Sequence, residues 1–168
     1  RKLGRRAFRR PVPEAEVSAL LDLYGAVRAN AGWNEAMAMV IQGILNSPRF
    51  LYHIEIGTDL GNGVAELDDY EIASKLSYYL WNSTPDETLD AAADAGELHT
   101  PEQIRAQAMR MLMSDRAREV AASMESQWFD LAKVRAVTKD LTQYRALTEE
   151  VRNDMIKETL TLLDDLVW

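Results

Sequence analysis

The sequence predicts an all-α fold of about seven helices, in an orthogonal or irregular bundle of two parts with no significant sheet. Three observations predict this class. Apolar residues recur at helical spacing in almost every segment, and capping patterns mark several helix starts. Only 8 glycines and 5 prolines occur in 168 residues, and we find no Gly-rich hairpin turn. Hydrophobic residues make up 47% of the chain, which is enough for a packed core.

The first ten residues are strongly basic, whereas the rest of the chain is acidic. The net charge is -8, and the chain after residue 10 carries 13 basic and 27 acidic side chains. Leu3, Ala7 and Phe8 form an apolar side at helical spacing, so we expect the basic side chains to dock on the acidic body. The alternative is an arm that recruits a membrane or an anionic polymer. The acidic remainder would repel phosphate, so we expect no nucleic-acid partner. The basic residues are Arg1, Lys2, Arg5, Arg6, Arg9 and Arg10.

Two helices are predicted in the N-terminal third. Pro13 in a first turn, followed by acidic residues, starts a helix that ends around residues 30–32. A second helix covers about residues 33–46. Ser47-Pro48 either breaks it or restarts a short turn, and residues 50–56 fit a short helix or an extended chain. Residues 57–63 hold three glycines and read as a linker. The residues predicted to point inward from the second helix are Met37, Val40, Ile41, Ile44 and Leu45.

Capping patterns define the remaining helices. Asp68-x-x-Glu71 is a capping box for a helix that runs to Trp81. Thr84, as an N-cap before a proline, starts a helix that stops before Gly96. Thr100-Pro101-Glu102-Gln103 starts a helix to about Met113. Ser114-Asp115 starts the next helix, in which Val120, Met124 and Trp128 recur every four residues. After a looser stretch over 134–144, Thr148 caps a last helix through Val151, Met155, Leu162 and Leu166.

These elements suggest three segments. We expect a small N-terminal helical domain at 1–57, a Gly-rich linker at 58–66 and a larger helical domain at 67–168. The chain has no initiator Met and ends within an amphipathic pattern, so we expect a piece of a longer polypeptide, with the larger domain truncated at its C-terminus. No apolar run approaches the roughly 20 residues of a membrane span. The absence of cysteine excludes disulfides, thiolate chemistry and covalent haem attachment within this segment.

Three phrases of this sequence resemble a known pair of domains. They are Arg5-Arg6-Ala7-Phe8-Arg9-Arg10-Pro11, the run from Ser47 to Glu55, and the run from Leu67 to Trp81 with Ser83-Thr84-Pro85-Asp86. The pair consists of helical domains of unknown function, DUF1595 followed by DUF1592, from large exported planctomycete and myxobacterial proteins associated with cytochrome c. The resemblance implies a periplasmic or extracellular location. It also implies haem c elsewhere in the polypeptide, and other domains of that polypeptide as partners. It names no catalytic residue.

Several polar and aromatic residues are candidates for a pocket. His53 and Glu55 share a face if their segment is extended, where they could bind a metal or share a proton; a polar surface pair is the alternative. Arg49 and Glu55 could form a buried ion pair between the domains. Tyr70 and Tyr78 share a helix face with Ser74, and Tyr79 and Trp81 lie beside it; this face lines either a pocket or the core. Asp68 and Asp69 are explained by capping and by the helix dipole.

The sequence therefore favours a non-catalytic structural or interaction module of a larger exported, cytochrome-associated protein. We expect no catalytic residue, metal site or cofactor in this segment, and the sequence leaves the oligomeric state open. The alternative is a cofactor- or substrate-binding part of an oxidoreductase. Its pocket would lie near the Tyr70–Trp81 helix, with Arg49, His53 and Glu55 at the mouth. If this segment itself retained a metal or haem, His53, His99 and the methionines would be the candidate ligands.

Overall fold

The structure is a computed structural model, and it describes residues 2–140 and 142–168. The prediction of an all-α class is confirmed: the described residues contain ten helices, eight of them at least seven residues long, and one small hairpin. The three helices not counted from the sequence are short. The chain divides into two compact units, Arg1–Ala108 and Met109–Trp168, within one helix. Arg1, a member of the predicted basic arm, lies outside the described residues.

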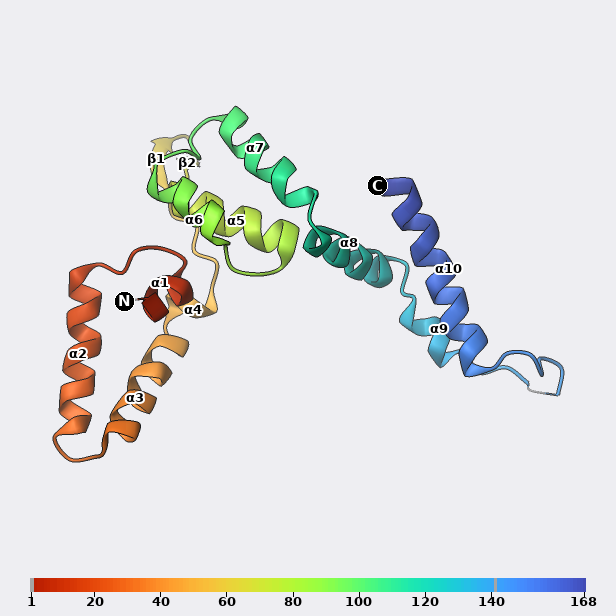
Figure 1. The fold of residues 1–168 in the computed structure, drawn as a ribbon, viewed down its shortest axis with the longest axis horizontal. Helices are drawn as coiled ribbons and strands as arrows, with labels where there is room; N and C mark the ends of the chain where they lie inside the picture. Colours follow the sequence, from red (N-terminus) through yellow and green to blue (C-terminus); the bar gives the residue numbers. More distant parts are fainter. Residues whose placement is uncertain (1, 141) are drawn as a thin grey trace. The chain divides into compact units, whose positions relative to one another are not determined.

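The first unit begins with four helices, α1 (Lys2–Phe8), α2 (Glu14–Arg28), α3 (Trp33–Leu45) and α4 (Pro48–Leu51) (Figure 1). Pro13 occupies the N-cap of α2 rather than its first turn, since its backbone is extended. Ser47 restarts the chain as α4, because its hydroxyl accepts a hydrogen bond from the Arg49 N–H. α2 and α3 pack on each other, but α2 has no buried residue. The prediction that Ile41 and Leu45 point inward is wrong, since both are exposed; Ile44 is buried.

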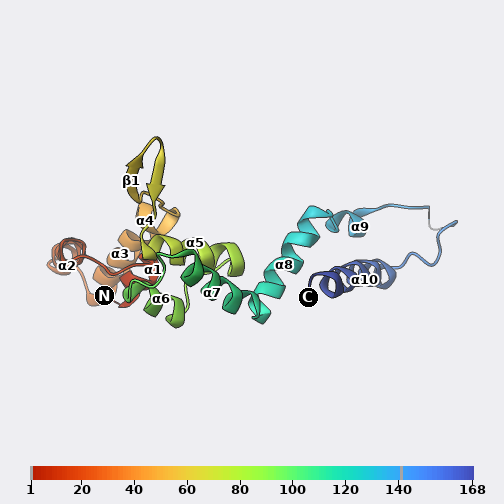
Figure 2. The ribbon, with the colours of Figure 1, turned by 90° about the horizontal axis from the view of Figure 1, so that it is seen from above.

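A two-stranded antiparallel hairpin follows, formed by β1 (Thr58–Gly61) and β2 (Val64–Glu66). Thr58 pairs with Glu66 and Gly61 with Val64, and an irregularity lies between Asp59 and Gly61. The prediction that the chain has no Gly-rich hairpin turn is wrong here. Asn62 and Gly63 both have positive φ, which a tight two-residue hairpin turn requires. Every strand residue is exposed, so no alternating pattern marked the strands; the hairpin projects from the helices (Figure 2).

Helices α5 (Asp69–Trp81) and α6 (Glu87–Asp94) pack together and form the main core of this unit. The predicted capping box at Asp68 is confirmed. The predicted N-cap at Thr84 is wrong: Asp86 caps α6 by accepting the Leu89 N–H at 2.8 Å. α6 ends before Gly96, as predicted, where a positive φ lets the chain turn back. The buried residues here are Asp69, Ala73, Ser77, Trp81, Leu89, Ala92, Ala93 and Leu98.

Helix α7 (Pro101–Leu112) contains the division between the two units. The predicted cap at Thr100 is confirmed, and Gln103 adds a reciprocal contact by accepting the Thr100 N–H. In the second unit, α10 (Glu149–Val167) packs on α8 (Asp115–Trp128) and on the short α9 (Ala132–Ala136). The predicted caps Ser114 and Thr148 are confirmed. This unit buries few large side chains; the recurring Met124 and Trp128 are exposed. Over the described residues, no helix is long and apolar enough to cross a membrane.

Candidate functional site

The candidate pocket residues gather in the first unit, where the chain after α4 lies along α5. We call residues 52–57 the linking segment. The His53 ring lies 3.9 Å from the Tyr78 ring, centroid to centroid, and Glu55 Oε2 is 2.7 Å from Lys75 Nζ. Gly57, at the other end, reaches Glu71 near the start of α5. The linking segment therefore runs antiparallel to α5 and is extended, one of the two conformations that the sequence left open.

Glu71 fastens the linking segment to α5. Its carboxylate accepts the Ile56 N–H at 2.8 Å and the Asp68 N–H at 3.0 Å, and it accepts the Gly57 N–H with both oxygens. Burial alone would raise the pKa of Glu71, but the backbone N–H groups of Ile56, Asp68 and Gly57 outweigh it and lower that pKa. The capping residue predicted from the sequence thus has a second role that no local pattern indicates.

Arg9 holds the start of the linking segment from the other side. Its side chain is largely enclosed, with the residue only 7% exposed, and Nη2 donates to the carbonyl oxygens of Arg49 and Tyr52 at 2.8 Å each. The guanidinium also lies over the Tyr78 ring, 5.5 Å from its centroid. From the sequence, Arg9 was only one member of the basic arm. No sequence signal separates it from the neighbouring arginines.

A second contact joins α1 to α5 and α6. Arg5 Nη2 lies 2.8 Å from Asp94 Oδ2, and the Tyr70 hydroxyl donates to Asp94 Oδ1 at 2.8 Å. Burial, together with this hydrogen bond, raises the pKa of Tyr70 to about 12. The Tyr70 and Arg5 contacts lower the pKa of Asp94. The prediction that the basic arm docks on the acidic body is thus confirmed for Arg5, whereas Lys2 and Arg6 are exposed.

The predicted buried ion pair between Arg49 and Glu55 is wrong. Arg49 Nε lies 3.1 Å from Glu16 Oε1, an atom that Arg10 Nη2 also approaches at 2.7 Å. Glu55 pairs with Lys75 instead. The two residues separate because Arg49 is on α4 beside the start of α2, whereas Glu55 is on the linking segment beside α5. Both side chains are substantially exposed, at 46% for Arg49 and 40% for Glu55.

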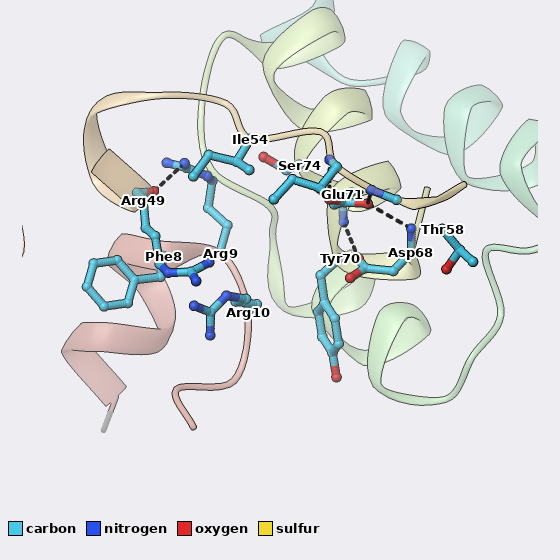
Figure 3. A pocket seen from close by; sticks show the side chains of 12 residues that line it. Phe8, Arg9, Arg10, Arg49, Ile54, Thr58, Asp68, Tyr70, Glu71 and Ser74 are labelled. Carbon is cyan, nitrogen blue, oxygen red and sulfur yellow. Dashed lines mark hydrogen bonds between the residues drawn. The ribbon is translucent and has the colours of Figure 1, made fainter. Parts of the chain in front are cut away.

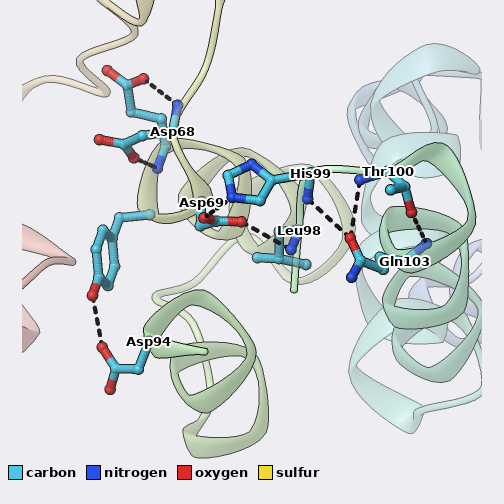
Figure 4. Close-up of polar contacts among 9 residues, drawn as sticks. Asp68, Asp69, Asp94, Leu98, His99, Thr100 and Gln103 are labelled. Carbon is cyan, nitrogen blue, oxygen red and sulfur yellow. Dashed lines mark hydrogen bonds and ion pairs between the residues drawn. The ribbon is translucent and has the colours of Figure 1, made fainter. Parts of the chain in front are cut away.

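Asp69 makes contacts that the sequence analysis missed. It is buried, and its Oδ1 accepts the Leu98 N–H at 2.8 Å while Oδ2 lies 3.0 Å from His99 Nε2 (Figure 4). The sequence had explained Asp69 by the helix dipole alone. The two residues are thirty positions apart, so no local pattern could pair them. Asp68 and Asp69 therefore have separate partners and do not form a joint carboxylate site.

Two clefts flank the linking segment. The first, of about 290 Å³, contains Arg49 and Tyr70, and the second, of about 360 Å³, contains His53, Glu55 and Tyr78. Ile54, Glu71 and Ser74 line both clefts. Trp81 lines neither and is buried in the core. Figure 3 shows the first cleft; its other lining residues are Phe8, Arg9, Arg10, Ile56, Gly57, Thr58 and Asp68.

The second cleft brings two of the predicted residues together. His53 and Glu55 both face the second cleft, as an extended segment requires. Glu55, however, is paired with Lys75, and the His53 ring packs on Tyr78. Within residues 2–140 and 142–168, no group of three or more His, Asp or Glu side chains could hold a metal ion.

Comparisons with known proteins bear on both parts of the chain. A family model described as PSD4, a protein of unknown function (DUF1592), matches residues 67–168. A second, described as PSD5, a protein of unknown function (DUF1595), matches residues 1–55. Their order is the one that the sequence phrases indicated. No curated protein and no solved structure matches the chain.

Proposed function

This chain belongs to the PSD4 family of proteins of unknown function (DUF1592), and we propose that it is a non-catalytic helical module with a structural and interaction role. It would serve a larger exported, cytochrome-associated polypeptide, whose other domains are its partners. One observation carries the proposal. The polar and aromatic side chains beside α5 are used to fasten residues 1–57 to α5 and α6.

These contacts leave few groups free for chemistry. Glu71 is shared among three backbone N–H groups, and Arg9 holds two carbonyl oxygens. A general base or nucleophile needs a partner within reach and an open path to substrate. The carboxylates of Asp94 and Asp69 are instead held by side chains and backbone of the same unit. Such saturated contacts are suited to holding two segments in one geometry.

An exposed apolar cleft supports the interaction role. It has a volume of about 320 Å³ and lies among α1, α2 and α3. Leu21 and Trp33 on its rim are 62% and 60% exposed. A large exposed apolar patch on a folded protein usually marks a surface that binds a partner. The lining residues are Leu3, Gly4, Val12, Val17, Leu20, Leu21, Tyr24, Trp33, Met37, Val40 and Ile44.

The wider setting rests on the sequence resemblance. Export to the periplasm or the extracellular space, and haem c elsewhere in the polypeptide, are supported only by the likeness to exported, cytochrome-associated proteins. The segment has no C-x-x-C-H motif, so a covalently attached haem would have to lie elsewhere in the polypeptide. The module would then stand beside the redox chemistry rather than perform it.

The first experiment combines an absorbance spectrum with metal analysis of the chain purified without chelator. The proposal expects no haem band and no metal at molar equivalence. Retention of either one would overturn the non-catalytic role and direct attention to His53, His99 and the methionines. The interaction role has its own test, hydrogen exchange of α2 and α3 in the chain and in a longer polypeptide containing it. Equal exchange in both would count against it.

The clefts beside α5 favour one alternative, a cofactor- or substrate-binding part of an oxidoreductase. Its residues would be Arg49, His53, Glu55, Tyr70 and Tyr78. If the cofactor is tightly held, the metal and haem analysis distinguishes this alternative from the non-catalytic role. For a loosely held cofactor, the two proposals are separated by titrating the chain with redox cofactors and following the backbone-amide NMR signals of His53 and Tyr78.

A further inference from the structure

The basic end of the first cleft holds a pre-oriented arginine. Arg10 Nη2 donates to Oε1 of Glu16 at 2.7 Å, and Arg49 Nε forms an ion pair with the same oxygen at 3.1 Å. This shared carboxylate fixes the two guanidinium groups beside one another. The terminal Nη groups of Arg49 donate to no group within residues 2–140 and 142–168, and the side chain is 46% exposed. Arg49 therefore presents two free donors in a set orientation.

Part of the wall of the same cleft is apolar. The rings of Phe8 and Tyr70 and the side chain of Ile54 line it (Figure 3). Ile56 lines it too. The Tyr70 hydroxyl is engaged by Asp94, so its ring, rather than a polar group, is available to a ligand. The volume of about 290 Å³ is near the lower end of small-molecule sites, about 300 to 1,000 Å³.

The charges select the kind of anion. Arginine guanidinium binds carboxylate and phosphate through paired N–H donors. The far side of this cleft carries Asp68 and Glu71, whose carboxylates would repel a multiply charged group. We propose that the cleft between α4 and α5 binds a small monocarboxylate with a short apolar body, held by Arg49; both Nη groups of Arg10 are already used, on the Pro11 carbonyl and on Glu16. Such binding does not depend on the structural role proposed above.

The test is a titration of the whole chain, followed by NMR of its backbone amides. Benzoate and hexanoate serve as probes, and N-acetyl-leucine represents the carboxyl terminus of a peptide. We expect saturable shifts at Arg49, Ile54 and Ser74. N-acetyl-leucine binding more tightly than hexanoate would indicate a peptide end as the source of the carboxylate, and the reverse order a free organic acid. Benzyl alcohol, which keeps the ring without the charge, should leave these amides unmoved.

Matched variants separate the site from general charge attraction. Arg49→Gln should weaken benzoate binding roughly tenfold or more, because a charge-assisted donor pair is lost. Arg6→Gln removes the same charge from an exposed position on α1 and should leave binding unchanged. Urea unfolding of each variant shows that it is folded. The proposal is overturned if folded Arg49→Gln binds as the wild type does. It is equally overturned if phosphate saturates these amides at lower concentration than benzoate, or if benzyl alcohol shifts them as strongly.

Discussion

The contact of Arg9 with the linking segment can be removed by Arg9→Met. Methionine keeps a long apolar side chain for the space beside Tyr78, but it cannot donate hydrogen bonds. The carbonyl oxygens of Arg49 and Tyr52 then lose a charged donor at 2.8 Å each. The ring of Tyr78 loses the guanidinium above it. The substitution therefore tests whether one side chain holds α1, α4 and α5 together.

The structure allows the size of the effect to be worked out. A hydrogen bond from a charged donor contributes about 1.5 to 3 kcal/mol, and Arg9 makes two at short distance. The cation–π contact adds about 0.5 to 1 kcal/mol. Relief of the desolvated charge, and burial of the methionine, offset part of this loss. We expect the free energy of unfolding of the first unit to fall by about 3 kcal/mol, a large share of the typical 5 to 15 kcal/mol.

Hydrogen exchange with urea unfolding is the suitable assay, because it reports on each segment of a two-unit chain separately. In Arg9→Met, the amides of α1, the linking segment and α5 should lose protection together. The control is Arg6→Met, which removes an exposed positive charge from α1, three residues before Arg9, and should change stability by less than about 0.5 kcal/mol. A loss below 1 kcal/mol for Arg9→Met, or a loss confined to α1, would refute the role of Arg9 as the joining residue.

Three further predictions concern the same junction. Glu71→Gln should destabilise the first unit at pH 7 by about 1 to 2 kcal/mol. Since folding lowers the pKa of Glu71, this stabilisation is present above pH 4.5 and is lost as the pH falls through the pKa of the folded state. The urea midpoints of wild type and variant should therefore converge in acid. Gly57→Ala should lower the free energy of unfolding by about 2 kcal/mol in the same measurement, because φ is positive there and a Cβ would meet the Glu66 carbonyl. Gly63 also has a positive φ but has open space around it, so Gly63→Ala should cost only about 1 kcal/mol. Tyr70 has a folded pKa of about 12 against 10 when unfolded, so its stabilisation is complete below pH 10 and is lost as the pH rises through 12. Tyr70→Phe should therefore reduce the fall of the urea midpoint at alkaline pH. An unchanged fall would contradict this.

Helix starts were predictable because capping is local. Asp68 with Glu71, Thr100 with Gln103, and Thr148 each act within three residues, and each forms the cap that the sequence indicates. The N-cap of α6 shows the limit of this reasoning. Thr84 and Asp86 are both good caps, and the position was decided by where the helical backbone begins, not by residue type.

The partners of the charged side chains were not predictable. Arg49 and Glu55 are six residues apart and opposite in charge, yet a short helix and an extended segment place them beside different elements. Asp69 meets His99 only because α6 returns the chain to the start of α5. The hairpin was missed for another reason: its Asn62-Gly63 turn lies among exposed residues, so the apolar alternation that usually identifies strands is lacking.

The division of the chain into domains brings these points together. The sequence predicts separate domains at 1–57 and 67–168, whereas the compact units divide at Ala108. Three contacts cross the predicted linker: Arg5 with Asp94, Arg9 with the Tyr78 ring, and Glu71 with the backbone N–H groups of Ile56 and Gly57. A fragment ending at residue 57 loses these contacts, although it keeps the hydrogen bonds of Arg9 to the Arg49 and Tyr52 carbonyls. We expect residues 1–57 alone to show weak helicity and no cooperative urea transition, while residues 1–108 retain both by circular dichroism. Cooperative unfolding of 1–57 with undiminished helicity would show that the junction joins two domains that are already stable on their own.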